Sequence, residues 1–166
     1  MVSIDEALLD EVTARARASA RRRHMHNFHG DYTEPVQRML NALEPESYIA
    51  PHRHPDPGKV EVFVALRGRL GVLEFEDAGT VRRGFVLEPN GPTHGIEIPA
   101  AVWHTILALA PGTVVYEVKP GPYDPARAKE HPPWAPPEGD PGAPAYLASL
   151  KPCFAAPRHP APVPTA

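Results

Sequence analysis

The sequence predicts a mainly β protein, a jelly-roll barrel with two N-terminal helices and a proline-rich C-terminal arm. From Ser47 to Lys119, apolar segments recur about every eight to twelve residues between Gly, Pro, Asn and Asp, which is typical of an all-β domain. Before this run the apolar residues have helical spacing, and after it prolines are frequent. A chain of 166 residues is long enough to bury one core, so we expect one domain. Its segments are residues 1–46, 47–120, 121–150 and 151–166.

The two expected helices lie in residues 1–46 and pack on the barrel. The first covers residues 3–23, because Ser3 and Glu6 have the spacing of a capping box and a stripe of apolar residues follows. The second covers residues 34–43, where Pro35 suits a first helical turn. Its apolar residues at helical spacing are Val36, Met39, Leu40 and Leu43.

The expected strands form two facing sheets that enclose a cavity, as in a jelly-roll barrel. They cover residues 47–54, 59–66, 69–75, 81–87, 93–98, 103–109 and 113–119.

The arm, residues 121–150, contains so many prolines that we expect it to wrap around the barrel without regular structure. Tyr123, Trp134 and Tyr146 indicate that it packs on apolar surface, since disordered chains contain few aromatics. That surface could belong to the same chain or to a neighbour, so a homodimer is one hypothesis. We expect residues 151–166 to be a disordered tail.

Composition excludes several classes of function. A net charge of −3 and a pI near 6.3 provide no positive field for nucleic acid. Cys153 is the only cysteine, which indicates a reducing compartment. The first residues lack the basic and apolar regions of a signal peptide, and no stretch is apolar enough to span a membrane. We therefore expect a cytoplasmic protein.

The strongest functional pattern is His52-Arg53-His54, because residues two apart on a strand point to the same face. Glu61 on the next strand and His104 on a later one complete a set of three imidazoles and a carboxylate. Such a set suits one divalent transition metal, namely Fe, Mn, Ni or Zn. A second pair, His24 and His26, lies among arginines without a nearby carboxylate, and we expect it to be exposed.

Two stretches resemble the motifs of the cupin superfamily. His52-x-His54 is followed by six residues, Glu61, six residues and Gly68, and Pro99-x-Ala101-x-x-His104 comes later. The resemblance implies a double-stranded β-helix whose metal ligands are His52, His54, Glu61 and His104. The gap before Glu61 is longer than in the motif, so Asp56 is an alternative carboxylate. Ala101 and Ala108 stand where the superfamily commonly has glycine and asparagine.

Over about residues 5–150 the sequence further resembles the WbuC-type cupin-fold metalloproteins. That family is associated with bacterial surface-polysaccharide gene clusters, which implies a small-molecule ligand such as a carbohydrate; its name assigns no reaction. The matching stretches are Asn27-Phe-His29, Pro35-Val-Gln-Arg38, Pro51-His-Arg-His54, Leu66-Arg-Gly-Arg69, Glu97-Ile-Pro99, Trp103-His-Thr105 and Glu117-Val-Lys-Pro-Gly-Pro-Tyr-Asp-Pro125.

Other polar residues are candidates for substrate binding. Glu117 and Lys119 share one strand face, where they would project inward as acid–base partners or outward as an exposed pair. The remaining candidates lie before the barrel, where they would either line its mouth or face solvent: Asn27, His29, Gln37 and Arg38.

Three functional hypotheses follow. The first is a metal-dependent enzyme that acts on a sugar or nucleotide sugar in surface-polysaccharide metabolism, by Lewis-acid isomerase or epimerase chemistry. The second is an Fe(II)-type dioxygenase. The third is a noncatalytic cupin that binds metal or sugar, or regulates other enzymes. A metal with an open coordination position facing a pocket would favour catalysis, whereas a closed four-ligand shell would favour a structural role.

Overall fold

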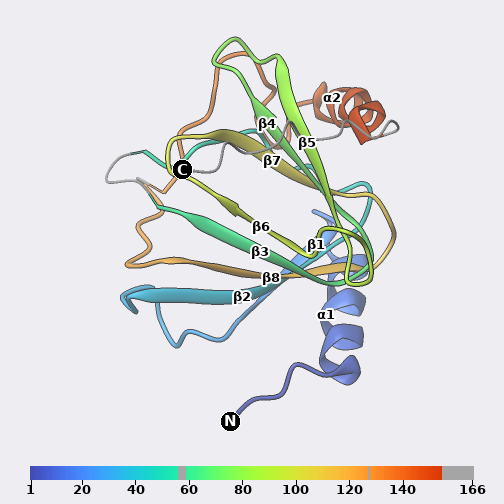
Figure 1. Ribbon diagram of the computed structural model, residues 1–166, viewed down its shortest axis with the longest axis vertical. Coiled ribbons are helices and arrows are strands. Elements are labelled where there is room, and N and C mark those ends of the chain that lie inside the picture. Colours follow the sequence, from blue (N-terminus) through green and yellow to red (C-terminus); the bar gives the residue numbers. More distant parts are fainter. Residues whose placement is uncertain (56–58, 127, 155–166) are drawn as a thin grey trace.

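Two antiparallel sheets face each other in the computed structural model, which describes residues 1–55, 59–126 and 128–154 (Figure 1). The larger sheet has the strand order β1-β2-β8-β3-β6 and the smaller one has the order β5-β4-β7. The strands are β1 Arg23–Asn27, β2 Val36–Leu43, β3 Glu61–Arg67, β4 Leu70–Phe75, β5 Val81–Leu87, β6 Gly95–Ile98, β7 Trp103–Ala108 and β8 Thr113–Pro120. The helices are α1 Glu6–Ala18, α2 Ala143–Leu150 and a short 3-10 helix, Lys151–Phe154. The predicted mainly β, two-sheet architecture is confirmed.

Apolar side chains occupy three layers. The core between the sheets includes Phe63 and Ile106, and it fills one end of the barrel. On the outer face of the larger sheet, Val12 of α1 packs on Leu40 and Val114. On the outer face of the smaller sheet, α2 and residues of the arm form the third layer. Both sheets are therefore covered on two faces over much of their area.

The first helix is shorter than predicted. It begins after Asp5, whose carboxylate accepts a hydrogen bond from the Leu8 amide (3.0 Å), and it ends at Ala18. Ser3 lies outside the helix and donates to the Asp5 carboxylate instead. An aspartate cap explains the shift, because Asp and Ser are equally good caps and Asp5 lies nearer to the apolar stripe.

The second predicted helix, residues 34–43, is wrong, because this segment contains strand β2. The strand pairs with both β1 and β8. Met39 and Leu43 face the space between the sheets, while Leu40 and Ala42 pack against α1. The inner face also carries the polar residues Gln37 and Asn41, so polar and apolar residues do not alternate along β2 and its apolar residues recur at helical spacing.

Two further boundaries differ from the prediction. Residues 23–27 form edge strand β1 although their arginines and histidines indicated an exposed helix end. Residues 47–54 form no strand, and only isolated bridges pair His52 with His104 and Arg53 with Glu130. Pro51 and Pro55 lack the amide hydrogens that a ladder needs, which limits pairing to this short stretch.

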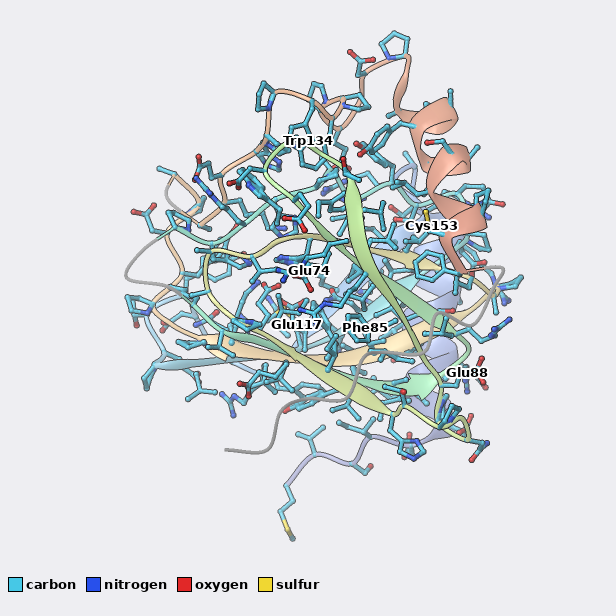
Figure 2. All side chains as sticks on the ribbon, turned by 45° about the horizontal axis from the view of Figure 1, so that its top comes forward. Glu74, Phe85, Glu88, Glu117, Trp134 and Cys153 are labelled. Atoms are coloured by element: carbon cyan, nitrogen blue, oxygen red, sulfur yellow. The ribbon has the colours of Figure 1, made fainter. Side chains whose placement is uncertain are left out.

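The arm packs on its own barrel. Trp134 lies against Phe75 and Trp103, and the Tyr48 hydroxyl donates to the carbonyl of Pro136 at 2.7 Å. Figure 2 shows Trp134 near the end of the smaller sheet at which β4 turns into β5. The prediction that residues 121–150 have no regular structure is wrong for α2.

Proline is tolerated in a first helical turn, where the missing amide hydrogen has no intrahelical partner, and Pro144 occupies that position in α2. The prediction of a disordered tail over residues 151–166 is wrong for residues 151–154. Residues 151–154 form a 3-10 helix, in which Phe154 packs so closely on Gly71 that a Cβ there would lie 2.6 Å from its ring. Residues 155–166 lie outside the described part of the chain.

Among the described residues, neither α-helix combines the length and apolar character needed to cross a bilayer.

We expect the contact between the arm and β1 to depend on pH through Glu138. Its carboxylate binds Arg21 (2.6 and 2.8 Å) and Arg23 (2.7 Å). Partial burial raises the Glu138 pKa, but the two arginines outweigh it and the pKa is lowered. A lowered pKa stabilises the fold above the unfolded-state value of about 4.3, and this contribution is lost as pH falls through the folded-state value.

Glu138→Gln should therefore reduce the free energy of unfolding near pH 7 but not below about pH 3, measured by urea unfolding across pH. Glu11→Gln is the control, because it removes an exposed ion pair with Arg15 on α1. If the free energy of unfolding differs between the wild type and Glu138→Gln by the same amount at every pH, Glu138 is not the source of the pH dependence.

Candidate metal centre

Backbone pairing brings together the side chains that were predicted as metal ligands. The amide of His52 donates to the His104 carbonyl and the amide of His104 donates to the His52 carbonyl, each at 2.9 Å. Two residues paired in this way project their side chains to the same face, so the two imidazoles lie side by side with ring centroids 4.4 Å apart. His54 follows two residues later, and Glu61 begins β3 on the opposite sheet.

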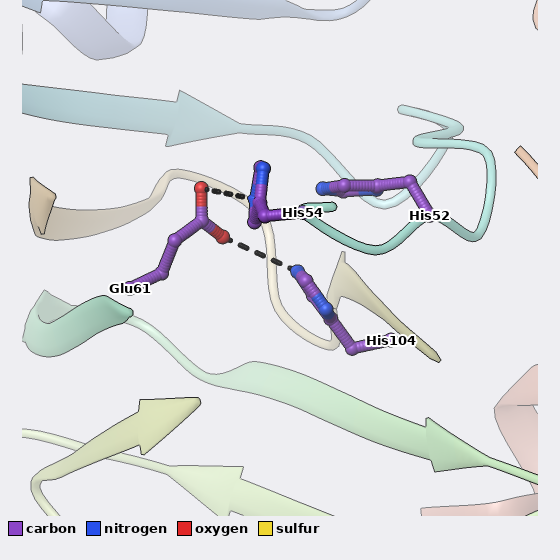
Figure 3. A group of neighbouring side chains, drawn as sticks. All are labelled: His52, His54, Glu61 and His104. Carbon is purple, nitrogen blue, oxygen red and sulfur yellow. Dashed lines mark hydrogen bonds and ion pairs between the residues drawn. The ribbon is translucent and has the colours of Figure 1, made fainter. Parts of the chain in front are cut away.

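The four side chains converge on one point between the sheets (Figure 3). One donor atom from each lies within 4.8 Å of all the others. Glu61 Oε1 is 2.9 Å from His54 Nε2, and Glu61 Oε2 is 3.2 Å from His104 Nε2. All four residues are at most 4% exposed. We call His52, His54, Glu61 and His104 the His/Glu cluster.

Backbone carbonyls orient the three imidazoles. The Nδ1 atom of His52 lies 3.0 Å from the Ala50 carbonyl oxygen, that of His104 lies 2.9 Å from Val102, and that of His54 lies 2.5 Å from Ala128. A proton on Nδ1 that is donated to a carbonyl leaves the lone pair on Nε2, which is the tautomer of a metal ligand. All three Nε2 atoms can therefore offer a lone pair to a metal ion inside the cluster.

The charge states also fit a divalent cation. Burial raises the pKa of Glu61, but the adjacent imidazoles of His104 and His54 and the charge of Lys119 outweigh it, so this pKa lies well below its ordinary value. Burial, aided by the charge of Lys129, holds the pKa of His52 well below its ordinary value. Glu61 is thus ionised and His52 neutral near pH 7, as metal ligation requires.

One buried nitrogen of the cluster lacks a hydrogen-bond partner among the described residues. His54 Nε2 lies 2.9 Å from Glu61 Oε1 but makes no aligned hydrogen bond with any described residue. A buried polar atom without a partner is costly, and a cation between the four side chains would satisfy it. The described His/Glu cluster could therefore hold a metal ion.

A buried ionic chain continues from the cluster along β8. Lys119 Nζ lies 3.2 Å from Glu61 Oε1 and 2.6 Å from Glu117 Oε1, and the amide of Asn41 donates to the other oxygen of Glu117. Figure 2 shows Glu117 between the two sheets. Burial lowers the Lys119 pKa, but the charges of Glu117 and Glu61 outweigh it and raise it. Of the two predicted orientations, Glu117 and Lys119 adopt the inward one.

Three members of the cluster, His52, Glu61 and His104, line a cavity of about 500 Å³. Asn27, His29 and Gln37, which were predicted near the barrel mouth, also line it, although Gln37 lies on a strand and not on a helix. The Gln37 amide donates to backbone carbonyls, including that of Glu34 at 3.0 Å. Arg38 is not part of the lining, since it forms an ion pair with Glu34.

Lys129 and His131 also line the cavity but were not predicted as site residues. Both lie in the proline-rich arm, whose sequence has no helical or strand periodicity. The direction of these side chains therefore could not be predicted from the sequence. The short spacing of Lys129 and His131, with one residue between them, is the only signal in the sequence. His24 lines the cavity as well, although its pair with His26 was expected to be exposed.

The long gap before Glu61 does not displace this carboxylate from the histidines. Residues 56–58 lie outside the described residues, so the alternative ligand Asp56 is not placed. Ala101, where the motif commonly has glycine, adopts a positive φ of 62°. This left-handed conformation favours glycine, which explains the motif and shows that the same turn forms here with alanine.

Comparison with solved structures shows a general fold similar to that of CapF, and a weaker match is described as an RmlC-like cupin. The capsular polysaccharide assembling protein CapF from Staphylococcus aureus is 16% identical, with a TM-score of 0.51; the match covers 65% of this chain and 29% of CapF. KdgF from Halomonas sp. is 16% identical, with a TM-score of 0.47 and coverage of 61% and 81%. An RmlC-like cupin from Desulfovibrio desulfuricans is 17% identical, with a TM-score of 0.43 and coverage of 60% and 82%.

The chain belongs to the family described as Domain of unknown function (DUF6016), whose profile matches residues 4–87. That range contains α1, β1 to β5 and three members of the His/Glu cluster. No curated protein gives a significant match.

We expect Lys119→Met to destabilise the metal-free protein by about 3 to 5 kcal/mol, because it leaves two buried carboxylates without their shared cation. Urea unfolding measures the change. Lys151→Met is the matched control on an exposed residue and should change the free energy of unfolding by less than about 0.5 kcal/mol. Equal losses in the two variants would show that Lys119 does not compensate Glu61 and Glu117.

Proposed function

We propose that this protein is a metal-dependent cupin enzyme that binds one divalent transition metal and acts on a small polar molecule. The observation that carries the proposal is the convergence of three imidazoles and a carboxylate at a point where His52, Glu61 and His104 line a cavity of about 500 Å³. A purely structural metal site is usually closed on all sides by protein. A ligand set that borders a cavity leaves room for a substrate, and the cavity lies within the usual size range of small-molecule sites.

Each residue near the cluster has a role in this proposal. His52, His54, Glu61 and His104 would hold the metal, which would supply Lewis-acid polarisation of a substrate oxygen. Lys119 keeps Glu61 ionised, and its ammonium lies beside the Glu117 carboxylate in the cavity wall, where the two groups would act on a substrate as proton donor and proton acceptor. Isomerase or epimerase chemistry requires such proton movement, which favours it over the dioxygenase alternative.

His29 supports a polar ligand. It is 7% exposed and lines the cavity, and its Nδ1 lies 3.0 and 3.1 Å from the backbone carbonyl and amide of Arg38. Its Nε2 atom is buried without a partner among the described residues. A hydroxyl or carboxylate of a substrate could provide the missing hydrogen bond, since buried polar atoms are rarely left unpaired.

A carbohydrate is the proposed substrate class. The sequence resemblance to the WbuC-type family, which is associated with surface-polysaccharide gene clusters, supports this choice. The rival proposal, a noncatalytic cupin that binds metal or sugar, shares the ligand set and differs in whether solvent or substrate reaches the metal.

The first experiment measures metal content. The purified full-length protein should contain about one equivalent of a transition metal by mass spectrometry, and His52→Ala and His104→Ala should weaken metal binding by at least about a hundredfold, beyond the effect of losing an outer-shell partner. His94→Ala is the control, because His94 is an exposed histidine outside the cavity lining. Unchanged metal binding in the two cluster variants contradicts the site.

A second measurement separates the enzyme from its noncatalytic rival. Water-proton relaxation of the Mn(II)-loaded protein reports water molecules that exchange at the metal. Fast exchange is expected if at least one coordination position faces the cavity. A closed shell without exchangeable water, together with retained metal, favours the structural role.

A further inference from the structure

The arm contributes a short segment, residues 128–131, to the wall of the cavity. The amide of Arg53 donates to the Glu130 carbonyl at 3.0 Å, and the amide of Glu130 donates to the Arg53 carbonyl at 2.9 Å. The Arg53 guanidinium also binds both oxygens of the Glu130 carboxylate, at 2.7 and 2.9 Å. This pairing fixes the segment beside the two histidines that flank Arg53.

Alternation along this extended segment explains which side chains reach the cavity. Glu130 faces Arg53, so Lys129 and His131, one residue away on either side, point to the other face. Both line the cavity. His131 Nδ1 lies 3.1 Å from the Pro51 carbonyl oxygen, and its ring centroid is 6.1 Å from that of His52. The His131 imidazole therefore lies directly beside the cluster with Nε2 free of this contact.

Charge in the cavity wall is unevenly compensated. Four Lys or Arg side chains and three Glu side chains line the cavity. Glu138 is paired with Arg21 and Arg23, while Glu61 and Glu117 share Lys119. These pairs leave Lys129 as the lining cation without a carboxylate partner among the described residues.

The surroundings of Lys129 favour an anion. The residue as a whole is exposed at the cavity mouth, yet nearby protein desolvates its ammonium enough to lower the pKa. Among the nearby charges, Glu61 and Glu117 raise this pKa while Lys119 and Arg23 lower it, so desolvation sets the direction of the shift. A bound anion would replace the lost hydration by charge-assisted hydrogen bonds.

We propose that Lys129 and His131 form an anion-binding subsite beside the His/Glu cluster, and that the substrate carries a carboxylate or phosphate group. This inference rests on the proposed function, because it assigns a substrate class to the same cavity. A divalent cation at the cluster would add positive charge to that wall and favour an anion further. A charged sugar, such as a sugar acid or a sugar phosphate, combines this group with the hydroxyls that His29 could bind.

The test uses the full-length, zinc-loaded protein with histidine rings labelled by ¹⁵N. Sodium acetate and inorganic phosphate are titrated separately at constant ionic strength, and NMR follows the His131 ring. At least one anion should shift its resonances saturably in the millimolar range. A response to acetate assigns a carboxylate, and a response to phosphate assigns a phosphate. Absence of a saturable shift with both anions overturns the proposal.

Variants identify the residue that binds the anion. Lys129→Gln should weaken binding at least about tenfold, as expected for a lost charge-assisted hydrogen bond, while Lys129→Arg should retain it. Lys151→Gln removes an exposed lysine elsewhere and should leave the dissociation constant unchanged. Equal affinity in Lys129→Gln and wild type contradicts the subsite.

Zinc content of the same samples separates this inference from the proposed function. If the protein takes up neither zinc nor Fe, Mn or Ni, the proposed function fails, whereas the same titration of the metal-free protein still tests the subsite. If zinc is retained and the His131 ring does not respond to either anion, only the subsite is wrong.

Discussion

The ionised carboxylate of Glu61 is the constraint on which the interior of this protein depends. It is 2% exposed, and a buried charge without compensation is costly in a protein core. Two imidazoles and the ammonium of Lys119 surround it. Lys119 in turn brings Glu117 into the cavity wall, and Asn41 satisfies Glu117. The chain of buried ionic contacts in the barrel interior thus begins at this one group.

The coverage of the sheets explains why such a polar interior is compatible with a stable fold. α1 packs on the outside of β2 and β8, and α2 with the arm packs on the outside of the smaller sheet. Apolar burial on these outer faces supplies stability that the cavity side of β2 and β8 cannot supply. The arm has a second role, because its Ala128 carbonyl orients His54 and its Glu130 pairs with Arg53. An arm predicted as a wrapping segment thus reaches the candidate site.

Sequence patterns predicted the ligands better than the elements around them. His52 and His54 could be identified because the spacing of two residues implies a shared face, and this inference needs no knowledge of the strand's length. By contrast, Val36 to Leu43 was predicted as a helix, since polar Gln37 and Asn41 share the cavity face of β2 with apolar residues and leave an apolar pattern at helical spacing. Lys129 and His131 could not be found in this way, because only tertiary pairing between Arg53 and Glu130 brings them to the cavity.

X-ray absorption spectroscopy of the metal-loaded protein tests the central claim, that His52, His54, Glu61 and His104 bind one metal ion, most directly. The account predicts the scattering pattern of three imidazoles with one or more oxygen ligands and no sulfur. His104→Ala should remove one imidazole from that pattern. A site with at most one imidazole, or with a sulfur ligand from Cys153, would contradict the account.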